Sequence, residues 1–264
     1  MPITIDQYIV NPMQKQGRVM SAVMREAQRK HYTEVFNQIM LRENGHIDYT
    51  MYKDEDNNVY WIHIKVPSEA IKQFYYDVVF RFFADSNVAE SGQNLRKYYV
   101  QFYSNDPAYV FNYAYVFINN KLFPEDLTSR MSAQARHDAP KVTNPYQEIG
   151  YVKTLYFAFL FMQSRNLFNL VRWDEARKYS KDTLVSAVEN ADEKIARREE
   201  AGKRLNARNK AKRNAETAKR QSHEKLLASQ GRQSTIKNTR TTNTVKTTRK
   251  INNSIKVKNS KVVK

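Results

Sequence analysis

The sequence predicts an α+β fold: one antiparallel sheet packed by apolar helices, followed by a long charged helix and a basic tail. Three observations lead to this prediction. Segments with a two-residue apolar period follow one another between residues 47 and 103, and helical segments come after them rather than between them. All the aromatic residues lie at or before Tyr179. The excess positive charge lies in residues 201–264.

Composition divides the chain into three parts. Residues 1–175 hold the large apolar side chains whose burial offsets the ordering entropy of a fold, so we expect a folded, tyrosine-rich domain there. Residues 176–230 are rich in Ala, Glu, Lys and Arg and contain no proline, which predicts a long charged helix. Residues 231–264 carry ten Lys and Arg and no acid, and we expect this tail to be disordered unless bound.

The first helix is predicted over residues 21–43, where apolar residues recur at near-helical spacing after an extended start. Asn44-Gly45 follows, and both residues tolerate positive φ, so the helix is expected to end there.

Four strands are predicted next. Residues 47–53 and 60–66 alternate apolar and polar side chains on either side of an acidic turn, which is the pattern of a β-hairpin. Residues 74–83 and 95–103 continue the alternation. Because the connections between the runs are short, we expect a four-stranded antiparallel meander with one core face.

Apolar helices are expected to cover this sheet. Asp106-Pro107 supplies an N-cap followed by proline at the first helical position, so a continuous helix is predicted over residues 108–118. Another short helix is predicted to open at residues 123–126 and to end before Pro140. Residues 145–168 form the most apolar segment, which we expect to lie against the sheet.

Charge indicates a polyanion as partner. Residues 201–264 contain nineteen Lys and Arg and two acids, Glu216 and Glu224, so they carry +17, the formal charge of the whole chain. No aromatic residue lies among these bases, so we expect sequence-independent contact with phosphates and no base stacking. A solubilising role, or docking to an acidic protein, remains an alternative. The residues expected to bind nucleic acid are Arg204, Arg208, Lys210, Lys212, Arg213, Lys219, Arg220, Arg232, Lys237, Arg240, Lys246, Arg249 and Lys250.

A second candidate surface is the aromatic and polar face of the predicted sheet. If this face is exposed, it would resemble the stacking platform of a protein that binds single-stranded nucleic acid. If helices or a neighbouring subunit cover it, its side chains belong to the core. We expect this face to be buried, because the predicted helices are so apolar. The residues concerned are Trp61, His63, Lys65, Arg81, Tyr99 and Tyr103.

The sequence contains few residue patterns typical of catalytic or cofactor sites. We therefore expect that the protein is not an enzyme and binds no cofactor or metal. The six glycines form no phosphate-binding loop, and the five histidines lack the spacing of a metal site. The acidic turn is a conceivable site for a divalent cation, although hairpin turns are often acidic. A metal-dependent nuclease is the enzymatic alternative, and it would use Asp48, Asp54, Asp56, His63 and Lys65.

No membrane segment or secretion signal is expected. The N-terminal residues lack the basic start and apolar run of a signal peptide. The most apolar stretch, residues 155–162, is far shorter than the roughly 20 residues that a membrane span needs. Cysteine is absent, which excludes disulfides.

Five segments carry a resemblance to a known class of proteins: Asn11-Pro12-Met13, GHIDYTMY, PSEAIKQFYYDVVF, YSNDPAYVFNYAYVF and GYVKTLYFAFLFM. Together they resemble structural virion proteins of tailed bacteriophages, of the type found at the head–tail neck or inside the capsid. The resemblance spans roughly residues 10–170 and does not include the basic tail. Its motifs are packing motifs, so no functional residue is carried over from it.

The resemblance implies a symmetric assembly near packaged DNA. We therefore expect a non-enzymatic assembly protein of a virion, forming homo-oligomers and contacting other virion proteins, whose tail contacts the DNA backbone. The expected location is the virion or the host cytoplasm. A stand-alone protein that binds and condenses nucleic acid without sequence preference is the principal alternative.

Overall fold

The computed structural model describes residues 2–10, 14, 15, 18, 19, 22–84, 94–141, 144, 147, 149, 150 and 152–237. Along the last helix, side chains are described as far as residue 227. The chain forms two compact units, Met1–Ala207 and Arg208–Lys264. The first of these, which we call the folded unit, extends well past the expected boundary at residue 175.

The folded unit is built on a five-stranded sheet with the strand order β6-β5-β4-β3-β7. The predicted hairpin is confirmed: β3 and β4 are antiparallel, with Thr50 opposite His63 and Tyr52 opposite Trp61. Antiparallel pairing continues from β4 to β5 and from β5 to β6. The four long strands are β3 (Tyr49–Asp54), β4 (Val59–Pro67), β5 (Tyr75–Phe83) and β6 (Tyr99–Ser104).

The sheet is mixed, so the prediction of a four-stranded antiparallel meander is wrong in this respect. The fifth strand, β7 (Arg177–Lys178), pairs parallel with β3 at Tyr52 and Lys53. Two residues are too few to show a two-residue period, and a parallel pair joins segments that are distant in sequence. Nothing in the local pattern could therefore reveal this strand.

The fourth strand also begins later than predicted. Leu95–Lys97 forms a short 3-10 helix, η1, because the side chain of Asn94 accepts a hydrogen bond from the backbone N–H of Arg96 at 3.0 Å. Asparagine competes in this way with strand pairing. The alternation of apolar residues begins only with β6.

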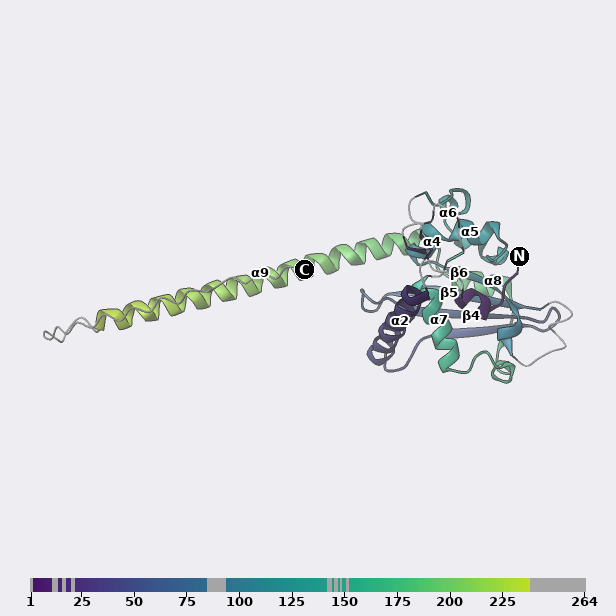
Figure 1. Ribbon diagram of the computed structural model, residues 1–264, viewed down its shortest axis with the longest axis horizontal. Helices are drawn as coiled ribbons and strands as arrows, with labels where there is room; N and C mark the ends of the chain where they lie inside the picture. The colour runs from purple at the N-terminus through teal and green to yellow at the C-terminus, as the bar shows by residue number, and fades with distance from the viewer. Residues whose placement is uncertain are drawn as a thin grey trace, which may run out of the picture. The chain divides into compact units, whose positions relative to one another are not determined.

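Three helices pack against one face of the sheet: α1 (Ile5–Val10), α2 (Ala22–Arg42) and α7 (Lys153–Ser164). Figure 1 shows α2 and α7 side by side on this face, and their contact includes Phe36 and Phe157, whose ring centroids lie 5.8 Å apart. Tyr8 of α1 packs on Phe102 of β6, and their ring centroids lie 4.3 Å apart. The most apolar segment therefore lies on the sheet as predicted, although its helix begins only at Lys153.

Local signals placed several helix ends correctly. Gly45, with φ of +74°, follows α2 and donates its N–H to the Met40 carbonyl at 2.7 Å. Asp106 caps α4 (Pro107–Asn112) by accepting the Ala108 N–H at 2.9 Å. The expected continuous helix is interrupted at Tyr113, and α5 (Ala114–Asn119) follows.

The remaining elements connect or cover the sheet. The aromatic rings of Trp61 and Tyr179 stack 5.1 Å apart on the second sheet face, and both faces of β4 are buried except at Lys65. The elements are β1 (Gln14–Lys15), β2 (Arg18–Val19), η2 (Glu125–Arg130), α6 (Ala133–His137), η3 (Leu170–Trp173) and α8 (Lys181–Ala187).

The predicted charged helix is α9 (Ala191–Lys237). It continues past the expected end at residue 230, and no proline or left-handed glycine interrupts it there. The expected disorder of the tail concerns residues 231–264, of which 231–237 belong to α9 and 238–264 lie outside the described residues.

Candidate nucleic-acid interface

The part of α9 from Arg208 to Lys237, which we call the basic arm, belongs to the second unit. Every residue of α9 from 206 to 227 is exposed. Within this stretch the acids Glu216 and Glu224 stand against seven bases, so positive charge dominates the surface of the helix. The seven bases are Arg208, Lys210, Lys212, Arg213, Lys219, Arg220 and Lys225.

The structure places the residues predicted to bind nucleic acid in three groups. Arg204 lies in the folded unit, exposed and paired with Glu200. Six residues lie exposed on the basic arm: Arg208, Lys210, Lys212, Arg213, Lys219 and Arg220. Arg232 and Lys237 also belong to α9, but their side chains are not described, and the remaining four lie outside the described residues: Arg240, Lys246, Arg249 and Lys250.

The basic arm carries charge that the chain itself does not neutralise. Among the described residues, no ion pair joins any base between 208 and 225 to an acid. The spacing of Glu216 and Arg220 favours such a pair, but it does not form. These side chains are therefore available to an anionic partner.

Helical geometry groups these bases further. At about 100° per residue, Arg208, Lys212 and Lys219 fall within roughly 40° of one another on the surface of α9. Arg213 and Arg220 form a second stripe about 100° away. By the same geometry Glu216 lies between the two stripes, so each stripe presents its own row of positive charge to phosphates.

The beginning of α9 is fixed to the folded unit by Glu189. Its carboxylate accepts hydrogen bonds at 2.7 Å from Lys194 and from Arg197. Its backbone carbonyl accepts the hydroxyl of Tyr103 at 3.3 Å, and its N–H donates to Asp77 at 3.3 Å. Arg197 thus pairs with Glu189 rather than with Glu193, the partner that helical spacing favours.

Asp77 is the centre of this buried network. Its carboxylate accepts hydrogen bonds from Nε2 of His63 at 2.8 Å and from Asn105 at 2.7 Å, as well as from the Glu189 N–H. Burial alone would raise the pKa of Asp77, but the hydrogen bond and charge of His63, the charge of Lys194 and the Asn105 amide outweigh it and lower this pKa. Asp77 is therefore an ionised carboxylate inside the fold.

The aromatic face of the sheet is core, as we expected. Trp61 is 1% exposed and Tyr103 is fully buried, with its hydroxyl donating to the Arg130 carbonyl at 3.1 Å. Burial, with the negative charge of Asp77 as a second cause, holds the pKa of Tyr103 well above its usual range. Of the six residues considered, Lys65 is exposed and Tyr99 and Arg81 are half-buried, so no continuous stacking platform is accessible.

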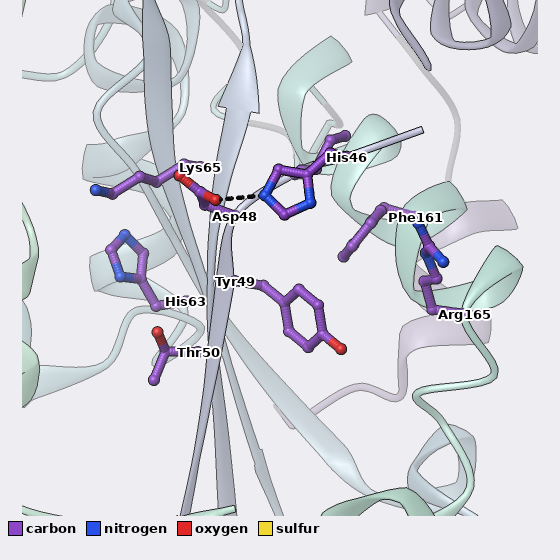
Figure 2. A pocket seen from close by; sticks show the side chains of 9 residues that line it. His46, Asp48, Tyr49, Thr50, His63, Lys65, Phe161 and Arg165 are labelled. Atoms are coloured by element: carbon purple, nitrogen blue, oxygen red, sulfur yellow. Dashed lines mark hydrogen bonds and ion pairs between the residues drawn. The ribbon is translucent and has the colours of Figure 1, made fainter. Parts of the chain in front are cut away.

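The residues of the nuclease alternative are divided between two places. Asp48, His63 and Lys65 line a cavity of about 500 Å³ (Figure 2). Asp54 and Asp56 line a different cavity of about 240 Å³, near Tyr179. No group of three His, Asp or Glu side chains within the described part of the chain is placed to hold a metal ion.

The network around Asp77 was not among the predicted sites. One signal in the sequence points to it: Asp77 is the only acid in a strand whose other residues, apart from Arg81, are apolar or aromatic, and a buried acid requires partners. The partners, however, come from β4, from the loop after β6 and from Glu189, two residues before α9, so strand register and the path of the chain before α9 determine that they meet.

No protein-family model, no curated protein and no solved structure matches this chain. Within the described residues, none of the helices is both long and apolar enough to cross a membrane.

Proposed function

We propose that this chain is a non-enzymatic assembly protein of a virion whose basic arm and following tail contact the backbone of DNA. One observation carries the DNA-binding part of the proposal: the seven exposed bases of the basic arm have no acidic partner among the described residues. Such a surface attracts a polyanion at long range and neutralises phosphates on contact.

The contact is expected to be independent of base sequence. The chain has no aromatic residue beyond Tyr179, so the basic arm offers no ring for stacking on a base. Lys and Arg side chains reach phosphates without reading base edges. Binding would then be driven mainly by release of counterions, which makes it steeply dependent on salt.

Neutralising the first stripe of the basic arm tests this proposal. The variant Arg208→Gln/Lys212→Gln/Lys219→Gln should bind duplex DNA more weakly and lower the slope of log affinity against log salt by roughly 2.7, because three phosphate contacts are lost. Fluorescence anisotropy at several salt concentrations measures both quantities. The helix itself should persist, since glutamine is a good helix former.

The matched control removes the same charge from the folded unit at three exposed positions, as Lys30→Gln/Lys72→Gln/Arg172→Gln. This control should keep nearly the whole salt slope. If both triple variants lose affinity and slope equally, net charge rather than the basic arm governs binding, and the proposal fails.

The virion setting rests on the resemblance to structural virion proteins over roughly residues 10–170. A protein of this kind acts as a symmetric oligomer together with other virion proteins. Native mass spectrometry should therefore show a homo-oligomer at high protein concentration. A strict monomer that still binds DNA would favour the stand-alone condensing protein instead.

A further inference from the structure

The cavity of about 500 Å³ lies at an open part of the sheet edge. The outer side of β3 is covered by β7 at Tyr52 and Lys53, and along the described chain no strand covers its first three residues. Both surfaces next to this edge contribute to the cavity. Its lining consists of His46, Ile47, Asp48, Tyr49, Thr50, His63, Lys65, Phe161 and Arg165.

His63 is held in one orientation at the wall of this cavity. The residue is 4% exposed, and its Nε2 lies 2.8 Å from the Asp77 carboxylate. Because Asp77 is ionised, Nε2 carries the hydrogen of this bond, which leaves Nδ1 as the second polar atom of the ring. Nδ1 takes part in none of the hydrogen bonds between described side chains, and His63 borders the cavity.

Two further hydrogen-bond donors share the sheet face of His63. Thr50 lies directly opposite His63 in the β3–β4 register, and Lys65 follows two residues along β4. Side chains in directly opposite positions have Cβ atoms about 5 Å apart. Figure 2 shows Thr50, His63 and Lys65 on one side of the strands, with Tyr49 and Phe161 on the other.

Lys65 is exposed, and among the described residues no ion pair joins it to an acid. The nearby carboxylate of Asp48 reduces the positive potential only in part. It accepts a hydrogen bond from His46 at 2.9 Å, and 68% of its side chain is exposed, so water screens it.

We propose that this cavity binds a phosphate group, with the Lys65 ammonium and the Thr50 hydroxyl as the donors and the fixed ring of His63 beside them. An ammonium and a hydroxyl on one wall are a donor set that suits the tetrahedral oxygens of phosphate. The group could belong to free phosphate or to a nucleic acid. This site is separate from the basic arm, and it goes beyond the proposed function without depending on it.

The test is a titration of the full-length chain with inorganic phosphate. The ring signals of His63 are followed by NMR. They should shift saturably, and His31 and His137, which do not line the cavity, should not respond. Saturable movement of the His63 signals supports the site, and their constancy up to high phosphate concentration overturns it.

Two exposed lysines give a matched pair of variants that leave the core intact. Lys65→Gln should weaken phosphate binding roughly tenfold, because it removes a charge-assisted hydrogen bond. Lys72→Gln removes an equal charge from a loop outside the cavity and should leave the dissociation constant unchanged. Equal weakening by both variants, or by neither, would contradict the proposed site.

A competition experiment distinguishes free phosphate from a nucleic-acid phosphate. A short single-stranded oligonucleotide is added to the phosphate-saturated chain while the His63 signals are followed. Displacement of phosphate identifies a nucleic-acid backbone as ligand, and no displacement identifies the free ion. Failure of this site would leave DNA binding by the basic arm untouched, since that binding is measured separately by anisotropy.

Discussion

At the scale of single residues, the fold depends on how Asp77 is satisfied. A buried carboxylate is costly unless its oxygens are hydrogen bonded, and here donors from His63, Asn105 and Glu189 satisfy it. In the sequence, Asp77 is the only acid in a largely apolar strand, but nothing there identifies these partners. Their meeting depends on strand register and on the path of the chain before α9, which no local period encodes.

Replacing Asp77 with asparagine should destabilise the folded unit by about 3 kcal/mol. The substitution removes the negative charge, and in either orientation the NH2 group of the new amide faces a donor: the Asn105 amide and the Glu189 N–H on one side, or Nε2 of His63 on the other. Urea denaturation at neutral pH measures the loss. Asp174→Asn, at an exposed position, is the control and should change the free energy of unfolding by less than about 0.5 kcal/mol.

The same pair of proteins has a defined pH dependence. Since the pKa of Asp77 is lowered in the fold, its ionisation stabilises the native state above the ordinary carboxyl pKa of about 3.9. This stabilisation is lost as pH falls through the lowered pKa. The difference between wild type and Asp77→Asn should therefore shrink in acid, and a difference that stays constant down to pH 2 would contradict the ionised state.

At the scale of helices and strands, capping and turn signals predicted what they directly encode. Asn44-Gly45 ends α2, and Asp106 begins α4. The predictions of strands failed where a distant segment or a competing side chain determines the local structure. The strand β7 needs β3 as its template, and Asn94 turns Leu95–Lys97 into a 3-10 helix.

Replacing either of two glycines with alanine tests the helix geometry, and the two substitutions should change the free energy of unfolding in opposite directions. Gly45 has φ of +74° and a Cβ there would meet nothing within 4 Å, so Gly45→Ala should cost about 1 kcal/mol from backbone strain alone. Gly202 lies within α9 in equally open space, so Gly202→Ala should stabilise by about 0.8 kcal/mol. Thermal or urea unfolding distinguishes the two, and destabilisation by both would contradict this assignment.

At the scale of the whole chain, composition predicted the division into a folded unit and a basic helix. The aromatic residues end at Tyr179, and the folded unit continues to Ala207 because Leu184, Val188 and Ala191 pack into its core. Sparse apolar residues in a charged segment gave too little signal to place that boundary. The candidate interface was predictable because charge needs no tertiary contact, whereas the cavity beside β3 was not, because its walls meet only in the sheet.

The salt dependence of DNA affinity tests the central claim most directly. The full-length chain should bind duplex DNA of unrelated sequences alike, and log affinity should fall against log salt with a slope of roughly −5 or steeper if six or more bases of the arm and tail meet phosphates. Affinity that stays the same between 50 and 300 mM salt, or no binding even at the lower concentration, would contradict the account.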